Sequence, residues 1–230
     1  KRRPRTIPRS TGANHHSRTD RMISHIDIST VLKHSVCDLY SNLVTRPTGA
    51  AVRIGIEHHL DEIGDKALAV LDFSHVGLLD FSCADEIVAK LLMQYVSVDI
   101  PRREVYFVFY GMSESHMDAI EAVLERHGLA LITQLANGAP MLVGEVEADQ
   151  RTAWEKVCEL GSIQAAELAV AIGVPADRAE RTLEMLWRRR LVIRQESNYA
   201  AVRNAARSTG PLSMLIDGSG KAGPGGVEAS

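Results

Sequence analysis

No apolar run in this chain of 230 residues approaches the roughly 18 residues that a helix needs to cross a bilayer. The basic run Lys1-Arg2-Arg3-Pro4-Arg5 has no apolar stretch behind it, which argues against a secretory signal. We therefore expect a cytoplasmic protein with no membrane partner.

Cysteine is scarce. Cys37, Cys83 and Cys158 are odd in number, lie far apart and lack metal-like spacing, so buried thiols in a reducing cytoplasm explain them best. The pairs His15-His16 and His58-His59 have no cysteine or acidic ligand at a suitable spacing. The glycine patterns of phosphate loops and dinucleotide-binding turns are absent as well. We therefore expect no metal and no cofactor.

Charge is unevenly distributed along the chain. Residues 1–22 carry 7 basic and 1 acidic side chains, residues 23–149 carry 8 and 19, and residues 151–207 carry 10 and 7. An acidic body between basic segments suggests that different parts contact different partners.

Composition divides the chain into four parts. Residues 1–22 are rich in Arg, Pro, Ser and His and predict a basic disordered tail, and residues 207–230 predict a flexible glycine-rich tail. Between them lie two patterned regions, 23–148 and 149–206. The change of pattern and of charge near 146–151 predicts that residues 23–146 fold independently of residues 151–206.

The first patterned region alternates strand and helix signals, which predicts an α/β domain with a mixed sheet covered by helices. Ser29 or Thr30 is expected to cap the first helix, and Gly128 to end the last one. The expected strands are 23–28, 67–73, 105–110, 130–133 and 141–146. The expected helices are 31–44, 50–63, a helix that begins at Ser82, and 115–127.

The second patterned region predicts three helices and then a strand pair. The helices are expected at 154–160, 165–172 and 177–190, and the strands at 191–194 and 199–202. This order is typical of a small winged helix-turn-helix domain.

The stretch 71–92 places several polar residues where a strand is followed by a helix. Ser82 stands at an expected helix N-cap, and Asp85 three residues later makes a capping-box-like pair. The simple interpretation is a cap, with the Ser82 hydroxyl accepting a backbone N–H from Ala84 or Asp85. The alternative is that Ser82 is phosphorylated, because a phosphate there would meet free backbone N–H groups and the positive end of the helix dipole.

The surroundings of Ser82 are expected to divide into an acidic surface and an apolar one. The carboxylates of Asp80, Asp85 and Glu86 are expected to face solvent and to be available to a partner. Leu78, Leu79 and Phe81 are expected to fill or rim the core.

The run Leu71-Asp72-Phe73-Ser74-His75-Val76, with Asp80-Phe81-Ser82 opening a helix, resembles the STAS domain of anti-anti-sigma factors. In that family the second hydroxyl residue of an Asp-Ser-Ser/Thr-Gly motif is phosphorylated by a partner kinase, and Ser82 occupies that position. Phe81 replaces the first Ser and Cys83 replaces the Gly. The string Ser-x-Ala-Asp-Glu at 82–86 is closer to a STAS-like family of uncharacterised function. The resemblance covers roughly residues 23–146.

The same stretch also offers the side chains of a thiol enzyme. Cys83 at a helix N-terminus would be the nucleophile, His75 its base, and Asp72 or Asp80 would orient the base. Three acidic neighbours oppose thiolate formation, and cysteine is commonly buried. We therefore expect no enzyme.

Arginines concentrate in the predicted winged helix. Arg178 and Arg181 lie near the start of the expected recognition helix, the end that normally enters the major groove. Arg189, Arg190 and Arg194 follow near the wing and would contact phosphates. The alternative is a solvated basic helix in a protein-binding domain.

The leading hypothesis is a bacterial regulator in which a STAS-like domain receives a protein signal and a winged helix acts on double-stranded DNA. The resemblance implies a partner of the histidine-kinase-like ATPase class, acting as anti-sigma factor or serine kinase. The main alternative is a protein-interaction adaptor in a partner switch whose winged helix never contacts DNA.

Overall fold

The computed structural model describes residues 22–36, 41–96, 103–135 and 137–203. The predictions for the two tails lie outside these residues, except that Met22 already begins the first strand. The predictions for Cys37 and His15-His16 also lie outside them.

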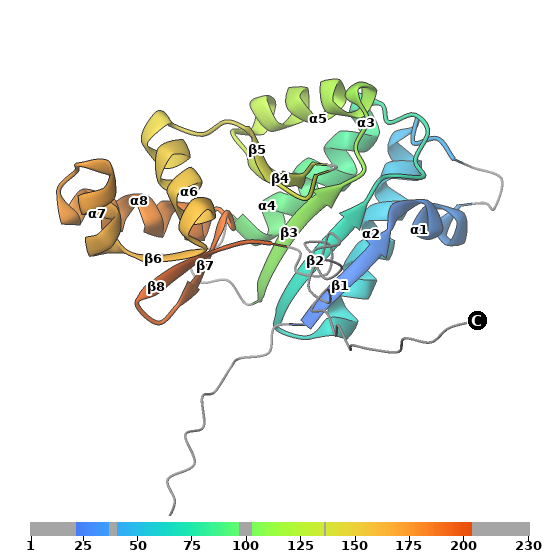
Figure 1. Cartoon of the computed structure of the whole chain (residues 1–230). Helices are drawn as coiled ribbons and strands as arrows, with labels where there is room; N and C mark the ends of the chain where they lie inside the picture. Colours follow the sequence, from blue (N-terminus) through green and yellow to red (C-terminus); the bar gives the residue numbers. More distant parts are fainter. Residues whose placement is uncertain (1–21, 37–40, 97–102, 136, 204–230) are drawn as a thin grey trace, which may run out of the picture.

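A mixed sheet of five strands forms the centre of the protein (Figure 1). Its order is β1-β2-β3-β4-β5, with β1 to β4 parallel and β5 antiparallel to β4. The strands are β1 (Met22–Asp27), β2 (Lys66–Asp72), β3 (Glu104–Tyr110), β4 (Ala130–Gln134) and β5 (Pro140–Gly144). The predicted α/β class with a mixed sheet is confirmed.

Helices from the same part of the chain cover one face of the sheet. They pack on alternate strand residues that include Ala69, Leu71, Phe107 and Phe109. The helical elements are α1 (Ile28–Ser35), α2 (Arg46–Ile63), α3 (Phe81–Ala84), the π-helical turn η1 (Asp85–Lys90), α4 (Leu91–Val96) and α5 (Glu114–His127). Because α3, η1 and α4 follow one another without a break, they form one continuous helical segment that packs on the sheet.

The boundaries of two helices differ from the prediction. Asp27, and not Ser29 or Thr30, caps α1 by accepting the Ser29 backbone N–H at 2.9 Å. The helix ends at Ser35, well before the predicted end at 44. The helix predicted at 50–63 begins earlier, at Arg46, because Thr45 caps it and proline fits the first turn of a helix. Residues 46–49 therefore belong to α2.

The C-terminal region consists of helices and a small antiparallel sheet with the order β6-β8-β7. Its elements are α6 (Ala148–Leu160), β6 (Ser162–Gln164), α7 (Ala165–Ile172), α8 (Ala176–Arg188), β7 (Val192–Gln195) and β8 (Asn198–Ala201). The first helix is longer than predicted, and β6 was not predicted.

This C-terminal region packs on the second face of the five-stranded sheet. One apolar cluster contains strand residues such as Val70 and Tyr106 together with Trp154, Leu183 and Leu186 of the C-terminal helices. The central strands are therefore apolar on both faces, as in sheets that are covered on both sides. The independent folding of residues 23–146 and 151–206 stays a prediction. Because the two parts share this cluster, separating them would expose apolar surface on both.

Among the described helices, none has the length and apolarity needed to cross a membrane.

Candidate functional site

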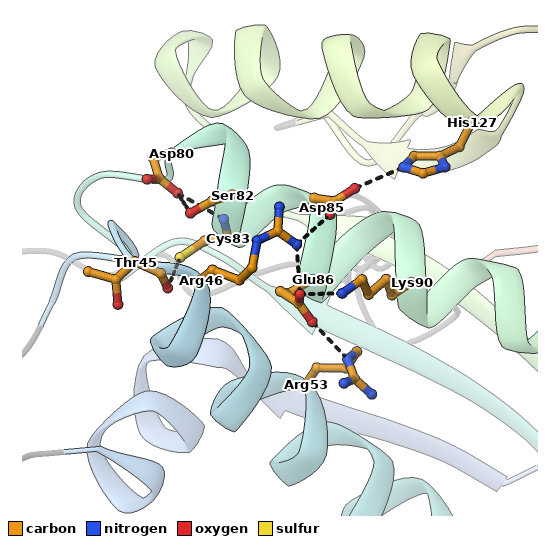
Figure 2. A network of polar contacts seen from close by, with 10 residues as sticks. All are labelled: Thr45, Arg46, Arg53, Asp80, Ser82, Cys83, Asp85, Glu86, Lys90 and His127. Carbon is orange, nitrogen blue, oxygen red and sulfur yellow. Dashed lines mark hydrogen bonds and ion pairs between the residues drawn. The ribbon is translucent and has the colours of Figure 1, made fainter.

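The loop after β2 leads into α3, and its last residue caps that helix (Figure 2). Asp80 Oδ1 accepts the backbone N–H of Cys83 at 2.8 Å and the hydroxyl of Ser82 at 2.9 Å. Ser82 therefore donates to the cap and is not itself the cap, so the predicted hydrogen bond from Ala84 or Asp85 was wrong. Asp is as good an N-cap as Ser, so the sequence already offered Asp80 as a cap. The Ser82-x-x-Asp85 spacing favoured Ser82 instead.

The carboxylates of Asp85 and Glu86 are buried, contrary to the prediction that they face solvent. The two residues are only 6% and 3% exposed. Both lie in η1, and π-helical turns occur frequently at functional sites. Of the three predicted acidic partner-binding residues, only Asp80 keeps part of its surface in solvent.

Basic side chains from three helical elements contact these buried carboxylates (Figure 2). Arg46 Nη1 lies 2.8 Å from Asp85 Oδ2 and 2.8 Å from Glu86 Oε1. His127 Nε2 lies 2.8 Å from Asp85 Oδ1. Glu86 also pairs with Lys90 and, at 3.5 Å, with Arg53 Nε. Sequence reasoning missed all four basic side chains, which come from α2, η1 and α5.

The pKa values reflect this pairing. Burial raises the pKa of Asp85, but the hydrogen bonds from Arg46 and His127 outweigh it and leave the pKa below its usual value. Burial likewise raises the pKa of Glu86, and Lys90 and Arg46 together bring it below the usual value. Both groups are therefore carboxylates at neutral pH, held in a network that does not resemble an acid–base pair.

A close approach of α2 to α3 makes this network possible. A Cβ added at Gly49 would lie 2.9 Å from Cys83 Cα and 3.1 Å from Glu86 Cβ. Only glycine fits there without a shift of the backbone. The approach also brings the carbonyl of Thr45 to within 3.0 Å of Cys83 Sγ, which donates to it.

Cys83 and His75 do not form the pair that the enzymatic reading required. Burial, followed by the charge of Asp80, raises the pKa of the Cys83 thiol to about 11. His75 is exposed and lies 3.9 Å from Asp27, whereas the thiol is bound to Thr45. A thiol of this kind is protonated at neutral pH and is a poor nucleophile.

Exposed apolar side chains lie on the two segments that meet just before Ser82, where Leu43 bonds to Leu78 and Asp80 through the backbone. Of the three residues expected to fill or rim the core, Leu79 is buried, whereas Leu78 is 56% exposed and Phe81 38% exposed, so these two do not fill it. A parallel bridge places Leu43 beside Leu79, which brings the exposed Val44 to the same end of the sheet. Val44, Leu78, Asp80, Phe81 and Ser82 are called the Ser82 surface below.

Three of the five predicted DNA-binding arginines are exposed but paired with carboxylates. Arg178 pairs with Asp149, Arg181 lies 2.8 Å from Asp177, and Arg194 lies 3.0 Å from Glu184. A groove of about 490 Å³ lies between α7, α8 and the β7–β8 hairpin, and its lining includes Glu180 and Glu196 as well as Arg194. The positive charge expected of this face is therefore largely balanced.

The other two arginines, Arg189 and Arg190, make contacts within the protein. Their predicted role in phosphate contacts is therefore corrected. Arg189 donates to the carbonyls of Gly128 and Glu145 and, at 3.1 Å, to Gln150 Oε1. Burial lowers the pKa of Arg189 from its ordinary value. Arg190 is 4% exposed, and its guanidinium lies over the ring of Tyr106. The two side chains fasten α8 to the rest of the protein.

Within the described residues, no group of three or more His, Cys, Asp or Glu side chains could hold a metal ion. His58 lies 3.6 Å from Glu62 on the exposed side of α2. Comparisons of the chain with models of protein families, with curated proteins and with solved structures gave no match in any of the three. Function must therefore be inferred from the side chains themselves.

Proposed function

We propose that the protein is a non-enzymatic regulator that binds a protein partner at the Ser82 surface. The observation that carries the proposal is the exposure of Val44, Leu78 and Phe81 around a half-buried serine at the end of the sheet. Exposed apolar side chains gathered with polar ones mark protein interaction sites. The resemblance of this stretch to STAS domains supports a partner of the histidine-kinase-like ATPase class.

Phosphorylation of Ser82 would alter this surface directly. The partner would transfer the γ-phosphoryl group of ATP to Ser82 Oγ, which releases ADP and the hydroxyl proton. The hydroxyl that now donates to Asp80 would be lost, and about two negative charges would lie beside the capping carboxylate. The start of α3 would then be repelled from its own cap, which changes the shape that the partner meets.

An assay with kinases of the source organism tests this proposal. Each histidine-kinase-like ATPase is purified and incubated with the full chain and ATP, and phosphorylated residues are identified by mass spectrometry. Phosphate at Ser82, absent in Ser82→Ala and retained in Ser74→Ala, supports the proposal. Binding to the same ATPase should weaken at least about tenfold in Phe81→Ser, a hot-spot loss. If none of these ATPases binds or modifies the chain, the proposal fails.

The C-terminal region supports an adaptor role better than DNA binding. Its order of helix, strand, two helices and hairpin favours a winged helix, which is the reason to keep DNA as a second candidate. However, DNA binding depends on unpaired cations, and the expected surface carries Glu180 and Glu196 beside an arginine that is already paired.

Electrophoretic mobility shifts at several salt concentrations decide between the two candidates. The adaptor proposal expects no retardation of mixed-sequence duplex DNA at 50 mM salt, a low ionic strength at which phosphate contacts are strongest. Retardation that weakens steeply with salt and is lost in Arg181→Ala would instead establish the DNA-binding candidate.

A further inference from the structure

Two adjacent residues at the end of α5 contact two separate parts of the protein. His127 binds the buried carboxylate of Asp85, with 2.8 Å between Nε2 and Oδ1 (Figure 2). The next carbonyl along the chain, that of Gly128, accepts a hydrogen bond from Arg189 Nη2 at 3.2 Å. A span of two residues therefore connects the network beside the Ser82 surface with the end of α8.

Backbone hydrogen bonds hold this junction in a fixed geometry. Gly128 has φ 62°, the left-handed conformation that ends α5, and its N–H bonds to the carbonyls of Leu124 and Glu125. The Glu145 N–H bonds to the Leu129 carbonyl at 2.9 Å. Because Arg189 also donates to the Glu145 carbonyl, it holds both chain segments of the junction at once. A shift of the end of α5 must therefore move the acceptors that Arg189 uses.

The other end of the link lies in the helix that begins beside Ser82. The Asp85 backbone N–H bonds to the carbonyls of Phe81 and Ser82, so the turn that carries Ser82 also sets the position of Asp85. Asp85 is nearly fully buried, which leaves its carboxylate little freedom to hold His127 after such a shift.

We propose that His127 and Arg189 form a link through which events at the Ser82 surface change the stability of α8. The coupling must be reciprocal, because two linked sites alter each other by the same free energy. The regulatory use of the link rests on the proposed function, whereas the link itself is a property of the isolated chain.

Hydrogen exchange of the full chain, without any partner, tests the link. The reporters are the N–H groups at the end of α8, among them Arg189, which bonds to the Met185 carbonyl, and Leu191, which bonds to the Leu186 carbonyl. His127→Ala should lower their protection by about tenfold, a typical size for coupled sites. The control Glu125→Ala, exposed on the same turn of α5, should lower it less than about twofold.

Two further variants separate coupling from general loss of stability. His127→Gln keeps an N–H donor for Asp85 and should restore most of the protection. Arg189→Met should lower protection in η1. Arg194→Met should not, because Arg194 pairs with Glu184 and lies over the rings of Trp187 and Tyr199, away from the acceptors that Arg189 uses. Equal effects of His127→Ala and Glu125→Ala, or an unchanged η1 in Arg189→Met, would overturn the link. Failure of the kinase assay alone would remove the proposed partner and leave the link standing.

Discussion

The guanidinium of Arg190 lies over the ring of Tyr106, with its carbon 5.6 Å from the ring centroid. Trp187 flanks the same guanidinium at 5.9 Å. Two nitrogens of the guanidinium, Nε and Nη1, have no hydrogen-bond partner. The backbone of Arg190 is in the left-handed region, with φ 62°. A cation held between aromatic rings of β3 and α8 is a structural contact. It ties the C-terminal region to the centre of the sheet.

The N-cap of α3 is expected to depend on Asp80 more than on Ser82. Asp80→Ala removes the acceptor for the Cys83 N–H and should cost about 0.5–2 kcal/mol of the free energy of unfolding. Ser82→Ala removes only one donor to that carboxylate and should cost less. Urea unfolding of both variants measures the difference. A larger loss in Ser82→Ala would contradict the assignment of the cap.

Removal of the Glu86 carboxylate should destabilise the protein strongly. Glu86→Ala removes the buried carboxylate that Arg53 and Lys90 contact, and loss of a charged hydrogen-bond partner costs about 1.5–3 kcal/mol. Glu62→Ala, on the exposed side of α2, should change stability by no more than about 0.5 kcal/mol. Thermal and urea unfolding compare the two. Similar small losses would show that the network contributes little.

The buried carboxylates should make the protein sensitive to acid. Asp85 and Glu86 have pKa values below the usual range in the folded protein. Their contribution to stability is therefore fully present above the unfolded pKa of about 4 and is lost as the pH falls through the folded pKa values. The urea midpoint should fall steadily below about pH 5, and it should fall less in Glu86→Ala. An unchanged midpoint down to pH 3, well below the unfolded value, would contradict this expectation.

Cys83 should resist alkylation in the folded protein. With a pKa of about 11, only roughly one thiol in a thousand is ionised at pH 8. Iodoacetamide at pH 8 should therefore modify Cys83 far more slowly in buffer than in 8 M urea, a denaturing concentration. Peptide mass spectrometry distinguishes the three cysteines. Rapid modification of Cys83 in buffer would restore the case for a reactive thiol.

The contact between α2 and α3 should not tolerate a methyl group at Gly49. Alanine is the better helix former by about 1 kcal/mol, but its Cβ would press against Cys83 Cα, and overpacking costs about 1–3 kcal/mol. Gly49→Ala should therefore be destabilising despite the gain in helix propensity. Calorimetry of this variant decides the sign, and a higher melting temperature would show that α2 can move away.

The elements that could be predicted from the sequence are those with strong local signals. The strand expected at 105–110 is found at 104–110. A short, continuous apolar run of this length between polar residues is typical of a strand that is buried on both faces. Gly128 ends α5 as predicted, since glycine adopts the left-handed conformation readily. These features depend on neighbours in the sequence.

The contacts of the candidate site could not be predicted in this way. Arg46 and Asp85 meet across 39 residues of sequence, and charged residues are ordinarily exposed. The short spacing of Ser82 and Asp85 suggested a local pair, whereas tertiary packing turned Asp85 toward His127. Likewise, the run of arginines at the end of α8 gave no sign that Arg189 and Arg190 meet partners on the sheet side.

The cover on the second face of the sheet also limits how this protein can change over evolution. Leu68, Val70 and Val108 belong to the apolar cluster that the C-terminal helices complete. A chain that ended before α6 would present this apolar surface to water and to other copies of itself. We therefore expect that the C-terminal region is not a module that evolution can move to another protein. We also expect that an early stop codon before α6 is not tolerated, because either event leaves a remnant that aggregates.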